Sequence, residues 1–135
     1  MKVKIGGYPN WRWYHTYLYR WFGYAPSQKK KIHIDPWDTW SMDYTLAQIV
    51  LPMLLQLAKE KHGSPMTDLD DVPWELRGDH EDDIHDRWDW IMKEMIYAFD
   101  AKVNDLDEWE FSKEKQERIQ NGFRLFGKYY TGLWD

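Results

Sequence analysis

The chain has 135 residues, a length at which one domain can bury a sizeable hydrophobic core without covalent staples. It contains no cysteine, which excludes disulfides, thiolate metal sites and cysteine nucleophiles. The net charge is −5, no apolar run approaches the roughly 18–20 residues that cross a bilayer, and the first residues lack the apolar stretch of a secretory signal. We therefore expect a cytoplasmic protein that makes no membrane contact.

The first third of the chain predicts two short strands around one helix. Apolar and polar residues alternate over Lys2–Ile5 and over Lys31–Ile34, which is typical of strands. Between them we predict a helix over Trp11–Phe22, with Asn10 as its N-cap and Gly23 closing it in the left-handed conformation. A strand pair alone is marginal in water, so we expect a helix beneath this small sheet.

The next predicted helix has Asp38 or Ser41 as its N-cap and runs to about His62. Its apolar residues fall on two faces, which is typical of a central, buried helix. Leu46, Ile49, Val50, Met53, Leu54 and Leu57 form one face, and Ala47, Leu51, Leu55 and Ala58 form the other.

Two further helices complete the predicted elements. An acidic loop over Ser64–Gly78 precedes a helix that starts near Asp79, where acidic residues suit the positive end of the helix dipole. The apolar stripe of this helix consists of Ile84, Trp88, Ile91, Met92, Met95, Ile96 and Phe99. After a turn at Asn104–Phe111, Ser112 is the predicted N-cap of the last helix.

These elements predict an α+β fold that is mainly helical, with about four helices packed with a minimal two-stranded sheet. We treat residues 1–135 as a single domain that contains a basic, aromatic-rich segment, 1–34, and an acidic helical core, 35–135. The segment 1–34 has no Asp or Glu and carries a charge of +7, whereas residues 35–135 carry −12. This asymmetry favours an anionic partner for the basic segment.

The basic segment is also rich in aromatic side chains: Tyr8, Trp11, Trp13, Tyr14, Tyr17, Tyr19, Trp21, Phe22 and Tyr24. On a helix these rings point in all directions, so a single core face cannot bury them all. Rings can stack on bases, and the interleaved Arg12 and Arg20 can pair with phosphate. The alternative is that this helix is sandwiched between the core and another subunit.

We therefore predict a ligand-binding site that combines rings for stacking with cations for phosphate. Its residues are Trp11, Arg12, Trp13, Tyr17, Arg20, Trp21, Lys29, Lys31 and His33. A compact anion suits this site better than long nucleic acid, because the acidic remainder of the chain would repel an extended phosphate backbone.

Two groups of ionisable residues resemble metal sites, but each has a simpler explanation. His33, Asp35, Asp38 and Asp43 include metal-ligand types, yet capping and the Asp-Pro turn account for the three carboxylates. On the predicted helix after Asp79, Asp82, Asp86 and Asp89 share a face with His85 nearby, which favours a solvated acidic face. We predict no catalytic residue, no metal and no cofactor.

A resemblance to a known family is carried by four strings of the sequence: IDPWDTWSMDYTLAQIVLPML, KHGSP, DRWDWIMKEMIYAF and NGFRLFGKYYTGLWD. Together with the opening VKIG they resemble small proteins of tailed marine phages. Members carry a longer stretch between the first strand and the strand at Lys29–Ile34, so the N-terminal region departs from the pattern. The family has no established activity. The resemblance implies a phage product in the cytoplasm of an infected bacterium and assigns no functional residue.

Three functions follow as hypotheses. The first is a binding protein that holds an anionic small molecule, a nucleotide by class, and sequesters a host defence signal. The second is a protein–protein interaction module, either a homo-oligomer or an inhibitor of a host protein, in which the basic segment of one chain meets the acidic Thr67–Asp86 region of another. The third is a metal-dependent phosphohydrolase of the HD type that uses His62, His85, Asp86 and Asp100.

Overall fold

A computed structural model describes residues 1–7, 9–78, 80–105 and 112–134 of the chain. The chain divides into two compact units, Met1–Ser41 and Met42–Asp135. The boundary lies seven residues after the change of charge that the sequence shows at Ile34, and the units carry +5 and −10. That residues 1–135 form a single domain stays a prediction.

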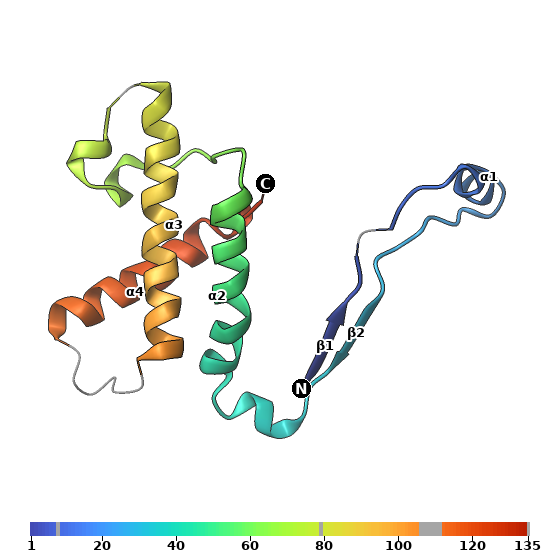
Figure 1. The fold of residues 1–135 in the computed structure, drawn as a ribbon, viewed down its shortest axis with the longest axis horizontal. Helices are drawn as coiled ribbons and strands as arrows, with labels where there is room; N and C mark the ends of the chain where they lie inside the picture. The colour runs from blue at the N-terminus through green and yellow to red at the C-terminus, as the bar shows by residue number, and fades with distance from the viewer. Residues whose placement is uncertain (8, 79, 106–111, 135) are drawn as a thin grey trace. The chain divides into compact units, whose positions relative to one another are not determined.

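The Met1–Ser41 unit is an antiparallel hairpin whose long connection carries a helix (Figure 1). Strand β1, Lys2–Ile5, pairs with strand β2, Lys30–His33, so that Val3 lies opposite Ile32. Helix α1, Trp13–Phe22, lies in the connection at the end away from the strands. A 3-10 turn, η1, Pro36–Thr39, follows β2.

The predicted elements of this unit are confirmed with small shifts. Helix α1 begins at Trp13, and its N-cap is Arg12 rather than Asn10, because the Arg12 backbone N–H donates to His15 Nδ1 at 2.8 Å. Gly23 closes the helix with a φ of 66°, as predicted. Tyr8, which we grouped with the other rings, lies outside the described residues.

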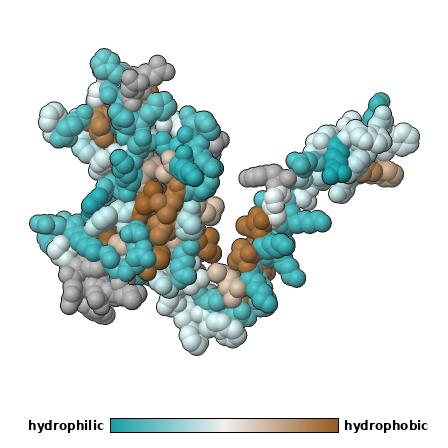
Figure 2. Space-filling view, in the orientation of Figure 1, coloured by the Kyte–Doolittle hydropathy of each residue, from teal (hydrophilic) through white to brown (hydrophobic). Residues whose placement is uncertain are grey.

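The expectation that a helix covers the small sheet is wrong for this unit. Every residue of β1 and β2 is exposed, and the apolar side chains of the strands form an open surface (Figure 2). Val3 and Ile32, which face each other across the strands, are 45% and 58% exposed. Among the described residues of the unit, only His15 is buried.

The Met42–Asp135 unit packs three helices: α2, Met42–Glu60; α3, Glu81–Asn104; and α4, Lys113–Lys128. Helix α3 packs against both α2 and α4 (Figure 1). Its predicted apolar stripe is confirmed, since Trp88, Ile91 and Met95 are fully buried. The prediction that α2 is the central helix is wrong. Among the described residues, α3 is the helix that packs closely against two others, α2 and α4, and one face of α2 stays open.

The segments between the helices differ from the sequence prediction in their details. Helix α2 begins at Met42, directly after Ser41, one of its two predicted caps; Asp38, the other, lies in the separate turn η1. The Ser64–Gly78 loop contains two 3-10 turns, η2, Leu69–Asp71, and η3, Trp74–Leu76. Ser112 caps α4 as predicted, its Oγ accepting the Lys115 backbone N–H at 3.2 Å. The predicted helix start at Asp79 and the turn residues 106–111 lie outside the described residues.

Helices α3 and α4 cross at a glycine. A Cβ atom added at Gly122 would lie 2.5 Å from the Ala98 Cβ and 2.5 Å from the Glu94 backbone oxygen. Beside this crossing, the Glu94 carboxylate accepts two hydrogen bonds from Arg118, at 2.8 and 2.9 Å, and the Arg118 guanidinium lies 3.7 Å from the centre of the Tyr97 ring. Both contacts hold α4 against α3 at a short interhelical distance.

We expect Gly122→Ala to lower the free energy of unfolding by about 1–3 kcal/mol, because the added methyl group forces the two helices apart. Gly127→Ala, in the same helix with open space around it, is expected to raise it by about 0.5–1 kcal/mol through helix propensity. Urea unfolding followed by far-UV circular dichroism measures both values. Equal stability of the two variants would contradict the close crossing.

Candidate functional site

Helix α1 presents one continuous face of rings to solvent. Trp13, Tyr17 and Trp21 recur every four residues along this face, and Trp13 and Trp21 are 77% and 75% exposed. The Trp13 and Tyr17 rings meet edge to face with centroids 6.2 Å apart. An open hollow of about 430 Å³ follows this ring face, and it is lined by Trp13, Tyr14, Tyr17, Leu18, Trp21 and Phe22.

Beside the ring face, further rings pack around His15. The His15 ring lies 4.4 Å from the Tyr14 ring, 5.8 Å from Trp11 and 6.4 Å from Tyr24, measured between centroids. The Trp11 indole N–H donates to Thr16 Oγ at 3.1 Å. The rings thus point in several directions, as predicted. Three of the four predicted stacking residues share the ring face, while Trp11 lies on the side of His15.

The predicted phosphate-binding cations do not join the ring face. None of the described residues that line its hollow is a Lys or an Arg. Lys31 lies on β2 instead, where it pairs with Lys4 of β1. Both lysines belong to the face of the hairpin opposite to the one that carries Val3. His33, also on the hairpin, places its Nε2 2.9 Å from Asp35 Oδ1.

The lysines and arginines of this unit have no carboxylate partner among the described residues. Within the part of the chain that the structure describes, no ion pair is formed by Lys2, Lys4, Arg12, Arg20, Lys29, Lys30 or Lys31. The two acidic residues of the unit instead contact the amino group of Met1, Asp35 at 3.2 Å and Asp38 at 2.9 Å. The unit therefore presents uncompensated positive charge.

The first group of residues that resembled a metal site, His33, Asp35, Asp38 and Asp43, makes other contacts in the structure. The pKa of Asp38 is lowered by its hydrogen bond to the amino terminus and by the Asp35 backbone N–H. Asp43 belongs to the other unit, where Lys102 Nζ lies 2.7 Å away and lowers its pKa. His85, proposed for phosphohydrolase chemistry, hydrogen-bonds Ser64 Oγ at 2.8 Å. Among the described residues, no three His, Asp or Glu side chains are grouped to hold a metal ion.

Among the described residues, the most strongly perturbed carboxylate is Asp71 in η2, which the sequence did not single out. It accepts hydrogen bonds from Arg124 at 2.7 Å, from Lys128 at 2.5 Å and from the Tyr129 hydroxyl at 2.6 Å. Burial raises its pKa, but these three donors outweigh burial and lower the pKa to about 2. Perturbed carboxylates are often catalytic. Here three donors of α4 and its C-terminal end occupy both carboxylate oxygens, so Asp71 holds the loop against α4.

We expect Asp71→Asn to cost about 2 kcal/mol of stability at pH 7, which corresponds to the fall in pKa from 3.8 to about 2. Because the pKa is lowered in the folded state, this stability is present above pH 3.8 and is lost as the pH falls towards 2. Asp70→Asn is the control, since the Asp70 side chain is 99% exposed. Urea unfolding at pH 7 and at steps down to pH 2.5 measures the free energy of unfolding of both variants. If Asp71→Asn loses no more stability than Asp70→Asn, Asp71 does not hold the loop against α4.

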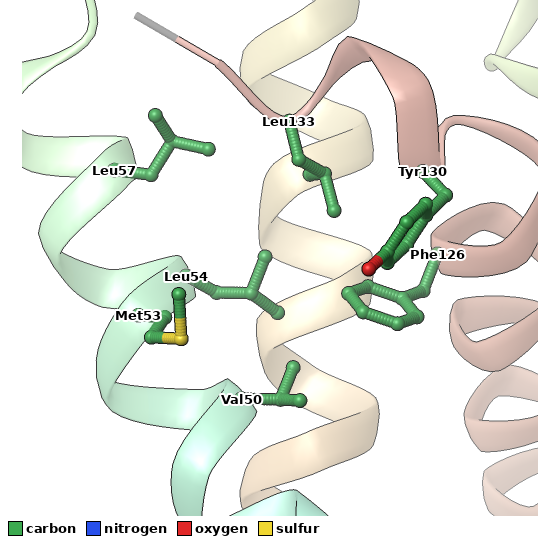
Figure 3. A pocket seen from close by; sticks show the side chains of 7 residues that line it. All are labelled: Val50, Met53, Leu54, Leu57, Phe126, Tyr130 and Leu133. Atoms are coloured by element: carbon green, nitrogen blue, oxygen red, sulfur yellow. The ribbon is translucent and has the colours of Figure 1, made fainter. Parts of the chain in front are cut away.

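An apolar groove lies between α2 and α4 on the Met42–Asp135 unit (Figure 3). One hollow, of about 410 Å³, is lined by Val50, Met53, Leu54, Leu57, Phe126, Tyr130 and Leu133. A second, of about 550 Å³, shares Val50, Phe126 and Tyr130 with it and extends to Leu46, Asp43 and Lys102. We call the two together the α2–α4 groove. Met53 and Tyr130 are 66% and 65% exposed, so the groove is open to solvent.

A scan against protein-family models and searches of curated proteins and of solved structures find no match to this chain. The resemblance to the phage family stays a prediction. Among the described residues, no helix is long and apolar enough to span a membrane.

Proposed function

We propose that this chain is a protein–protein interaction module and that the Met1–Ser41 unit is its contact surface. The observation that carries the proposal is the ring face of α1. Its lining has no charged side chain among the described residues, and its two tryptophans, Trp13 and Trp21, are about three-quarters exposed. Tryptophan and tyrosine dominate the binding energy of protein interfaces. Anchors that recur every four residues are typical of a helix that docks into a groove.

The lack of a core in this unit supports the same proposal. A chain of about 40 residues needs disulfides, a metal or a partner to be stable, and this sequence has no cysteine. Only His15 is buried among the described residues of the unit. Contact with a partner would bury the rings and the apolar strand face, and would supply the missing hydrophobic stabilisation.

The charge of the unit indicates which partner it suits. It carries +5, and within the described residues its lysines and arginines form no ion pairs. Complementary charge speeds association and suppresses wrong partners. An acidic protein surface with an apolar groove therefore fits this unit best.

The nucleotide hypothesis stays a prediction with weaker support. The ring face offers flat surfaces for stacking, but phosphate binding needs cations at the same site. The described lining of the hollow has none. A protein partner requires no such cations inside the hollow, because its contact with the ring face is apolar.

Photo-crosslinking tests the interaction proposal. We expect benzoylphenylalanine at position 21 to give protein crosslinks, both in the purified full chain and in bacterial cells. The same probe at position 74 is the control, because Trp74 is 77% exposed and Trp21 75% exposed. The crosslinks are read by mass spectrometry, which identifies the partner as a second copy or another protein.

Two results would contradict the proposal. The first is a crosslinking yield at position 21 no higher than at position 74. The second is a rise in melting temperature with mono-, di- or cyclic nucleotides that disappears in Arg12→Ala and Arg20→Ala. That second result would favour the nucleotide hypothesis instead.

A further inference from the structure

We infer that the partner of the ring face is a second copy of this chain, with α1 of each copy lying in the α2–α4 groove of the other. This inference rests on the proposed function, since it names the partner of the same surface. Three observations on the two surfaces carry it: their lengths, the chemistry of their linings and their charges.

The lengths of helix and groove agree. Helix α1 has 10 residues and is about 15 Å long at a rise of about 1.5 Å per residue. The groove follows α2 from Leu46 to Leu57, which is about 16–17 Å at the same rise. The whole ring face can therefore lie along the groove, with Trp13, Tyr17 and Trp21 each meeting one turn of α2.

The chemistry of the two surfaces also agrees. The ring face consists of five aromatic rings and Leu18. The part of the groove seen in Figure 3 is lined by aliphatic side chains of α2 on one side, and by Phe126 and Tyr130 on the other. Aromatic pairs across this contact are worth about 0.5–1.5 kcal/mol beyond the area that they bury. The one charged pair in the groove, among the described residues, is Asp43 with Lys102 at its far end.

The charges favour exchange between copies over contact of like surfaces. Two Met1–Ser41 units placed face to face would bring +5 against +5, whereas exchange brings +5 against −10. Reciprocal exchange between two copies forms a closed dimer with two identical contacts, so that no surface remains open to add further copies. The assembly should weaken as salt rises, because the attraction acts between exposed charges.

A pair of charge-introducing variants tests the exchange. Tyr17→Glu places a carboxylate in the ring face, and Met53→Glu places one in the groove. Tyr19→Glu and Met66→Glu are the matched controls: Tyr19 is as exposed as Tyr17, at 59%, but contacts Trp11, and Met66 is 82% exposed outside the groove. By sedimentation velocity we expect a wild-type dimer. The dimer dissociation constant should rise about 30-fold or more in each test variant and stay near wild type in the controls.

Mixing the two variants separates exchange from any other dimer. The Tyr17→Glu chain keeps an intact groove, and the Met53→Glu chain keeps an intact ring face. A 1:1 mixture should recover a dimer with one intact contact, although each variant alone is monomeric. Circular dichroism of each variant confirms that its helices are retained.

The outcomes distinguish this inference from the proposed function. A monomeric wild type, or a mixture that stays monomeric beside a dimeric wild type, overturns the exchange. If Tyr17→Glu prevents association and Met53→Glu does not, the ring face is still a protein contact but the groove is not its site. If position 21 gives no protein crosslinks, both the exchange and the proposed function are overturned.

Discussion

The close crossing of α3 and α4 at Gly122 is the contact on which the rest of the Met42–Asp135 unit depends. Because a glycine lets the two backbones approach, Glu94 can bind Arg118 with both oxygens. The crossing fixes the direction of α4, and so brings Tyr129 edge to face against Trp88, with ring centroids 5.9 Å apart. Phe126 on α4 and Tyr130 on the 3-10 turn that follows it, Tyr130–Gly132, line the groove.

The two units differ in where their free energy of folding comes from. In the Met42–Asp135 unit, apolar side chains of three helices and of the loop before α3 enclose the larger of two buried clusters around Trp88, Ile91 and Met95. In the Met1–Ser41 unit, hydrogen bonds of the hairpin and ring contacts around His15 hold the elements together, while the strand faces stay exposed. Burial of apolar side chains gives most of the stability of small domains. The Met1–Ser41 unit therefore depends on contacts outside itself for its stability.

The sequence predicted the elements well, because they follow from periodicity and capping, which are local. The stripe of α3, the cap at Ser112 and the closure at Gly23 are confirmed. It failed where the answer depends on distant neighbours. Two apolar faces on α2 indicated a central helix, yet one of them lines an open groove. The Asp71 network joins residues more than 50 positions apart. The predicted helix start at Trp11 placed Trp11 on α1, whereas the helix begins at Trp13 and leaves Trp11 outside it.

The exposed strands of the hairpin also bear on how separate chains meet. Both of its strands have an edge with unpaired backbone groups, which in general can template the addition of further strands. Lysines flank each edge, Lys2 and Lys4 on β1, and Lys30 and Lys31 on β2. Two such ribbons repel each other when they approach edge to edge. The lysines thus keep an apolar strand face in solution without letting it grow into a larger sheet.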